Sequence, residues 1–134
     1  MMFTVYGKPK GKARARTGKY GHYTPKETTA YEHAVRDSFL AAGGSLTNEP
    51  VVVKIDAFYA VPKSDTKAMR ALKLSNVIPP TIKPDVDNVE KIVLDGLNGI
   101  AYTDDSHVIG TTTFKQYDEV PRIEVHIDKY ERRQ

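Results

Sequence analysis

Residues 50–62, PVVVKIDAFYAVP, are the most strand-like stretch of this 134-residue chain. The stretch is rich in β-branched and aromatic side chains, which pack well on the pleated surface of a sheet. A shorter strand is predicted before it, at residues 3–7, and two more after it, at 107–117 and 120–128. We expect the last two strands to pair antiparallel with each other around a turn at residues 118–119.

Two main helices are predicted between these strands. The first begins with Thr24 as N-cap, Pro25 as the first helical position and Glu27 at the third, as in a capping box. Apolar residues continue at helical spacing until the Gly43-Gly44 pair, which predicts its end. The second helix is predicted over residues 88–98 and ends at an Asn-Gly pair.

The remaining segments are expected to be less regular. A short helix is predicted to begin at Ser64 and to run over residues 64–74, and a proline-stiffened extended segment covers 76–84. Residues 8–23 are predicted to be a basic loop, and residues 129–134 a polar tail.

This order of elements predicts an α/β (α+β) fold, in which a mixed β-sheet is packed against two main helices. The length fits a single domain over residues 1–134. The chain has no cysteine, which excludes disulfides, thiolate catalysis and cysteine-ligated zinc. No window is apolar enough to span a bilayer, and the N-terminus has no secretory pattern, so we expect a cytoplasmic protein.

The charge is distributed unevenly. Residues 1–26 hold seven basic residues and no acid, so the remainder of a chain with net charge +3 sums to −4. Such a basic arm on an acidic body favours a polyanionic partner, although a solubilising tail has the same composition. Glycines and aromatic residues lie among the charges and permit close approach and base stacking. The predicted DNA-binding residues are Lys8, Lys10, Lys12, Arg14, Arg16 and Lys19.

Carboxylates are concentrated around the second main helix. Asp85 and Asp87 are two residues apart, and in an extended backbone both would point into one space. Asp105 follows the helix closely enough for a turn to return it beside the helix start. Each acid alone has a structural explanation, such as a capping box of Asp87 and Glu90. Together they repel, by roughly 4 kcal/mol for two charges about 4 Å apart at an effective dielectric near 20, which favours a bound divalent cation. All-oxygen ligands suit Mg²⁺, with Mn²⁺ as a substitute.

With these features in view, the chain resembles the RusA family of Holliday-junction resolvases, which phages and prophages encode. The resemblance covers most of the chain, and its most specific part is PDVDNVEKIVLDGLNGIAYTDDSHV, residues 84–108. The family pattern there is D-x-D-N, a lysine four residues on, then L-D and D-D. The stretches GKPKGKARAR (7–16) and YTP (23–25) also match in style. The chain departs from the family at residues 101–103, AYT, where some relatives have a tryptophan.

The resemblance implies which residues form the site. The family's metal-binding acids fall on Asp85, Asp87 and Asp105, and its catalytic lysine falls on Lys91; Asp95 and Asp104 match positions of less certain role. It further implies a homodimer and Mg²⁺-dependent, paired nicking of four-way DNA junctions, with neither a membrane nor a small-molecule substrate as partner. A bacterial host cell and a phage or prophage origin are expected.

Two other functions fit the same residues. One is a Mg²⁺ nuclease that acts on flaps, forks or DNA of any form. The other is a structure-selective DNA-binding protein without catalysis, in which the acids only cap a helix and turn a loop. Their responses to Mg²⁺ differ, because binding alone tolerates removal of the ion and cleavage does not.

Overall fold

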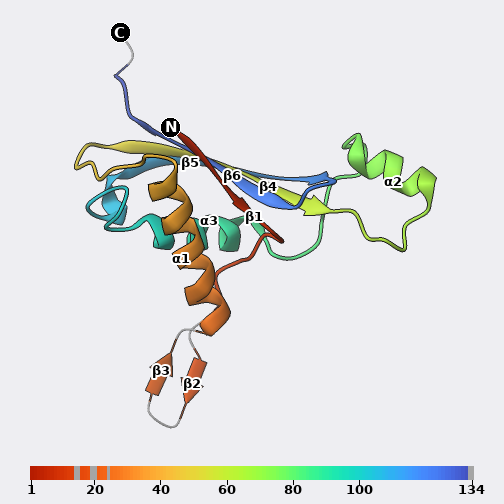
Figure 1. Ribbon diagram of the computed structural model, residues 1–134, viewed down its shortest axis with the longest axis horizontal. Coiled ribbons are helices and arrows are strands. Elements are labelled where there is room, and N and C mark those ends of the chain that lie inside the picture. Colours follow the sequence, from red (N-terminus) through yellow and green to blue (C-terminus); the bar gives the residue numbers. More distant parts are fainter. Residues whose placement is uncertain (14–15, 19–20, 24, 133–134) are drawn as a thin grey trace.

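The strand predicted from the opening stretch is present as β4 (Val51–Ala60), one of the two inner strands of the sheet. This computed structural model describes residues 1–13, 16–18, 21–23 and 25–132, with backbone alone for the two short internal ranges. On one side β4 pairs in parallel with β5 (Val108–Asp118), and on the other it pairs antiparallel with β6 (Arg122–Lys129). An edge strand, β1 (Met2–Tyr6), pairs antiparallel with β6. The order β1-β6-β4-β5 confirms the mixed sheet (Figure 1).

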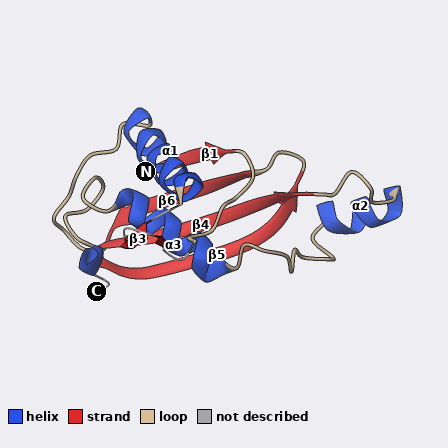
Figure 2. Cartoon of the chain, turned by 90° about the horizontal axis from the view of Figure 1, so that it is seen from below, coloured by secondary structure: helices blue, strands red, loops and turns tan. Residues whose placement is uncertain are grey.

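Both main helices cover the same face of this sheet. Every second residue of β4 is buried, as expected for a strand with one covered face. Helix α1 (Lys26–Ala41) and helix α3 (Val86–Leu97) lie over that face (Figure 2). Their buried residues join those of the strands in one apolar cluster. Burying each large aliphatic or aromatic side chain there contributes about 1.5–3 kcal/mol, which is the main force that holds the helices on the sheet.

The predicted hairpin of the last two strands is wrong. β5 and β6 do not pair with each other, because β4 lies between them and pairs with both. Asp118 is opposite Ala60, and Arg122 is opposite Phe58, so the connection passes over the end of β4. Two strand spacings amount to about 9.5 Å, which a few extended residues can span. The most apolar strand takes the centre because it gains partners on both edges.

Three helix starts differ from those predicted. Helix α3 begins at Val86 rather than at residue 88. The short helix α2 (Lys67–Leu74) begins three residues later than Ser64, because the Thr66 hydroxyl accepts a hydrogen bond from the Met69 amide at 3.2 Å and caps it. At α1, Pro25 is the N-cap rather than the first helical residue. The predicted cap Thr24 lies outside the described residues.

Residues 8–23 are not a loop throughout. Strand β2 (Arg16–Gly18) pairs antiparallel with strand β3 (Gly21–Tyr23), beyond the N-terminal end of α1 (Figure 1). This basic segment lacks the alternating apolar residues that indicate a strand, which is why its sequence did not predict one. The polar tail is also shorter than predicted, since β6 continues through Lys129. Across the described chain, no helix is both long and apolar enough to span a membrane.

Candidate functional site

The N-terminal end of α3 presents the first two candidate acids. Asp85 is the N-cap, with an extended backbone, and Asp87 lies in the first turn; both are exposed. The expectation that an extended backbone aligns them is therefore wrong, because the helix begins between them. The alternative explanation, a capping box of Asp87 and Glu90, does not hold either. The N-cap is Asp85, whose side chain makes no capping bond, and Glu90 accepts a hydrogen bond from Thr113 at 3.1 Å. The helix dipole favours acids here by about 0.3–1 kcal/mol each.

The central strand fixes the segment that leads into Asp85. The Tyr59 hydroxyl donates a hydrogen bond to the Pro84 carbonyl at 2.7 Å. From β5, the Lys115 ammonium donates to the Ile82 carbonyl and lies 5.2 Å from the centre of the Tyr59 ring. Burial, and after it the charge of Asp85, raises the pKa of Tyr59 to about 12, so the phenol stays a donor at neutral pH. The sequence did not indicate this support, since Tyr59 looks like any inward-facing strand residue.

One face of α3 carries a row of charges. Asp87, Lys91 and Asp95 are spaced four residues apart, which places them on one side of a helix. The Lys91 ammonium is 3.1 Å from Asp95 Oδ1, an ion pair between residues one helical turn apart. The rise of a helix separates Asp87 from Asp95 by about 12 Å along the axis.

The turn after α3 brings Asp105 near the C-terminal part of this row, where the charges of Lys91 and Asp95 act on it. Asp105 begins the 3₁₀ helix η1 (Asp105–His107), and Asp104 caps it by accepting a hydrogen bond from the Ser106 amide at 3.0 Å. Hydrogen bonding by the Ser106 side chain, and after it by this amide, lowers the pKa of Asp104. Burial raises the pKa of Asp105; the negative charge of Asp95 raises it further, and Lys91 opposes them. Asp105 therefore lies within the electrostatic reach of Lys91 and Asp95.

It remains a prediction that the carboxylates of Asp85, Asp87 and Asp105 bind one metal ion together. Among the residues that the structure describes, no group of three histidine, cysteine, aspartate or glutamate side chains is arranged to hold a metal. The donor chemistry nevertheless fits Mg²⁺, which proteins often bind through one or two carboxylates together with substrate phosphates. Asp85 and Asp87 supply such a pair, exposed at the start of one helix.

The root of the basic arm packs against the same helix start. Gly11 lies so close that a Cβ atom would be 2.7 Å from the Pro84 Cβ, so only glycine fits there without a shift. A hollow of about 300 Å³ at this junction is lined by Lys8, Lys83 and Asp85, among others. Positive charge of the arm thus borders Asp85, the first candidate acid.

The predicted DNA-binding residues have different surroundings. Lys8 and Lys10 are exposed, as phosphate contacts require. Lys12 is only partly exposed and is paired with acids on both main helices. Arg14 and Lys19 lie outside the described residues, as does the side chain of Arg16.

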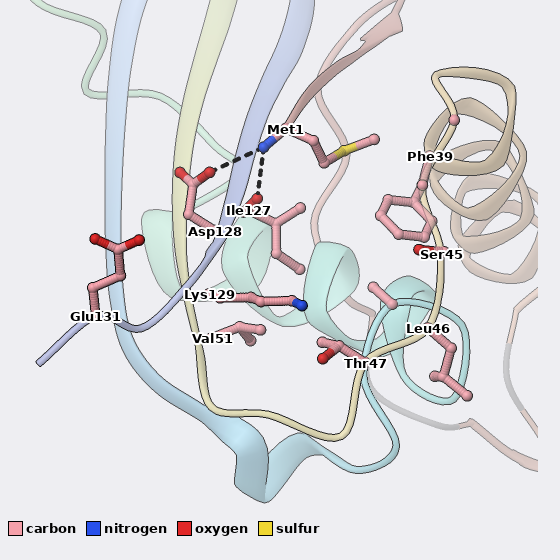
Figure 3. Close-up of a pocket in the computed structure, with 13 residues that line it drawn as sticks. Met1, Phe39, Ser45, Leu46, Thr47, Val51, Ile127, Asp128, Lys129 and Glu131 are labelled. Carbon is pink, nitrogen blue, oxygen red and sulfur yellow. Dashed lines mark hydrogen bonds and ion pairs between the residues drawn. The ribbon is translucent and has the colours of Figure 1, made fainter.

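A larger hollow, of about 480 Å³, contains none of the candidate site residues (Figure 3). It lies between Phe39, near the end of α1, and the end of β6. Three of its charged groups are in ion pairs, since the Met1 ammonium is 3.0 Å from Asp128 Oδ1 and Lys129 Nζ is 3.0 Å from Glu49 Oε2, and Glu131 adds a further acid to the lining. This hollow therefore offers less to an anionic substrate than the junction of the arm with α3.

Comparison with known proteins places these features in a family. Residues 6–128 match the family described as Endodeoxyribonuclease RusA. The chain is also similar to the uncharacterized protein YqaN of Bacillus subtilis (strain 168), with 34% identity over 134 residues and 93% of each chain covered. The matched range includes the arm, both main helices, the three candidate metal-binding acids, the candidate catalytic lysine, and the whole of β4 and β5.

Proposed function

The chain belongs to the RusA family of endodeoxyribonucleases, and from this premise we propose that it resolves Holliday junctions by paired, symmetric, Mg²⁺-dependent nicks. The observation that best supports the proposal is the packing of the basic arm on the helix start that presents Asp85 and Asp87. Cations suited to phosphates, Lys8 and Lys83, therefore line one hollow together with Asp85, a carboxylate suited to Mg²⁺.

Each part of the site has a task in this reaction. Lys8 and Lys10 bind backbone phosphates near the scissile bond. Asp85 and Asp87, with Asp105, would hold Mg²⁺. The bound ion supplies Lewis-acid activation of the phosphodiester and of the attacking water. The Lys91 ammonium stabilises negative charge that develops on the phosphoryl oxygens. Cleavage leaves a 5′-phosphate beside a 3′-hydroxyl, which a ligase can seal.

A homodimer suits this substrate. A four-way junction has approximate two-fold symmetry, and a two-fold dimer places two equivalent sites against it. Each protomer then makes one nick, and the two nicks fall symmetrically. We propose that the dimer acts on recombining DNA in the cytoplasm of a bacterial host.

Cleavage assays on three DNA forms test this function. A synthetic mobile four-way junction, a flap and a linear duplex are incubated with the protein, with Mg²⁺, with Mn²⁺ and with EDTA. We expect symmetric paired nicks on the junction alone, with either ion and not with EDTA. Equal cutting of flaps or linear duplex would indicate a less selective nuclease, and binding without cleavage would indicate a DNA-binding protein.

Substituting Asp87 tests the assignment of the acids. We expect Asp87→Asn to lower the nicking rate at least about 100-fold, the effect of losing an essential group at a charged transition state. Junction binding should be unchanged or tighter, because the substitution removes repulsion of the phosphates. Asp37→Asn is the matched control, an exposed aspartate on α1. Normal nicking by Asp87→Asn contradicts the assignment.

A further inference from the structure

Lys12 joins the two main helices through a chain of ion pairs. Its ammonium is 2.9 Å from Glu32 Oε2 on α1 and 3.1 Å from Asp95 Oδ2 on α3. The other oxygen of the same carboxylate, Asp95 Oδ1, is 3.1 Å from the ammonium of Lys91. Asp95 is therefore held from both sides, by Lys12 and by the candidate catalytic lysine.

The backbone of Lys12 is fixed as well. Its amide donates a hydrogen bond to the Asn88 carbonyl in the first turns of α3, at 2.8 Å. The preceding residue, Gly11, packs against Pro84 and Asn88 more closely than a side chain would allow. The position of the Lys12 side chain is thus set by the docking of the arm on α3.

The burial of Lys12 differs from that of a phosphate contact. Its side chain is 24% exposed, and those of Glu32 and Asp95 are 18% and 19% exposed, whereas Lys91 is 59% exposed. Excluding water strengthens such pairs. Burial by itself lowers the pKa of Lys12, but the hydrogen bonds with Glu32 and Asp95 raise it by more, so the ammonium stays charged.

Asp95 needs this second cation because of its surroundings. The charge of Asp95 acts on Asp105, whose pKa it raises, so these two carboxylates repel each other. Lys12 neutralises part of the negative charge from the side opposite to Lys91. Asp95 can then keep its bond to Lys91 while Asp105 remains nearby.

We propose that Lys12 is a positioning residue, which fixes the carboxylate of Asp95 so that Asp95 can orient Lys91 for the cleavage step. This role rests on the proposed function of the site and assigns Lys12 a task other than direct DNA contact. It links the arm that binds the substrate to the lysine that acts on it.

Replacing Lys12 distinguishes a role in positioning Asp95 from a direct contact with DNA phosphates. We expect Lys12→Met to lower kcat for junction nicking about 10-fold or more, with the junction Kd within twofold of wild type and an unchanged salt dependence of binding. Lys12→Arg keeps the charge and should recover most of kcat. A raised Kd and a shallower salt dependence, with normal kcat, would make Lys12 a phosphate contact and overturn the proposal.

One further variant serves as a control. Lys129→Met removes a lysine from another ion pair between segments, with Glu49, and should change neither kcat nor Kd.

A charge exchange gives a second test. Combining Lys12→Glu with Glu32→Lys moves the cation to α1, still facing Asp95. This double variant should exceed the single Lys12→Glu variant in kcat, and equal rates in the two overturn the proposal. If Lys12→Met does not fold, Asp95→Asn takes its place, because it removes the charge that holds both Lys12 and Lys91. Its kcat should fall, and a wild-type kcat overturns the proposal.

A direct measurement on Lys91 separates failure of this inference from failure of the proposed function. In ¹⁵N NMR of the lysine ammonium groups, Lys12→Met should speed the exchange of the Lys91 protons with water, because Asp95 no longer holds them. Unchanged exchange overturns the positioning role even if the protein cleaves junctions. Faster exchange in a protein that cleaves no DNA supports the positioning role and contradicts the nuclease.

Discussion

At the scale of single residues, Tyr59 connects the core to the candidate site. Its ring is almost fully buried beneath the helices, while its hydroxyl reaches the Pro84 carbonyl, one residue before Asp85. The ring stabilises the sheet, and the hydroxyl determines where the first candidate acid lies. These two tasks can be separated by removing the oxygen alone.

We expect Tyr59→Phe to lower the free energy of unfolding by about 1 kcal/mol, the typical net value of one hydrogen bond. Nicking should fall several-fold, because small misplacement of a reacting group is costly. Urea unfolding and a junction-cleavage assay measure the two effects. Tyr6→Phe, at a tyrosine that is 74% exposed on β1, is the control and should change neither.

Tyr59 also predicts a dependence of stability on pH. Its pKa is raised from 10.0 to about 12 in the folded protein, so folding favours the neutral phenol. Below pH 10 the phenol is neutral in both states and the contribution is fully present; it is lost as the pH rises from 10 through about 12. Burial also raises the pKa of Tyr31 and Tyr102, so Tyr59→Phe should weaken this decline without abolishing it. Urea titrations at several alkaline pH values measure this decline in the free energy of unfolding. An identical decline in Tyr59→Phe and wild type would contradict the contribution of Tyr59.

At the scale of elements, the crossing of α1 and α3 determines the geometry of the charged row. Gly96 makes the close approach possible: a Cβ atom there would be 3.0 Å from the Glu32 carbonyl oxygen and 3.0 Å from the Val35 Cβ. The same crossing brings Glu32 near Asp95, so that one lysine can bind both. The packing of the helices and the ion-pair chain therefore depend on each other.

We expect Gly96→Val to lower the free energy of unfolding by about 1–3 kcal/mol, the usual cost of overpacking a core. The helices must separate, so the ion pair of Lys12 with Asp95 should weaken and nicking should fall. Gly110→Ala is the control, since a Cβ atom there would lie at an ordinary distance of 3.6 Å from Val52. A Gly96→Val protein with wild-type stability and activity would show that the crossing tolerates a wider spacing.

Local signals in the sequence predicted the elements better than their partners. Composition identified β4, and periodicity identified α1 and most of α3. The pairing of β5 and β6 could not be read in this way, because adjacent strands in sequence usually pair and here the more apolar β4 separates them. In the site, the four-residue spacing of Lys91 and Asp95 is compatible with the ion pair that the structure contains. The role of Lys12 was not visible, because its partners are contributed by two other elements.

At the scale of the whole molecule, charge is separated between the arm and the body. The arm holds seven positive charges within residues 1–26, and the rest of the chain is net negative. This arrangement attracts DNA to one region of the surface and repels it from others. Asp85 lies where Lys8 of the arm meets the start of α3.

The salt dependence of junction binding should report this separation. We expect the combined variant Lys8→Ala and Lys10→Ala to bind junctions more weakly. The slope of log K against log salt concentration should fall by about 2 for each protomer bound, or roughly 0.9 for each phosphate that is no longer neutralised, and therefore by about 4 for the proposed dimer. Fluorescence anisotropy with EDTA present measures binding without cleavage. An unchanged slope would mean that these two lysines touch no phosphate.

The connectivity of the sheet has a consequence for how the protein is made. β6 lies between β1 and β4, and Met2 pairs with His126, so strands from the two ends of the chain are neighbours. While the ribosome is still translating, β1 and β4 lack the strand that joins them, and their apolar faces stay exposed. The sheet can close only after synthesis has passed residue 129, so the nascent chain must avoid aggregation until then.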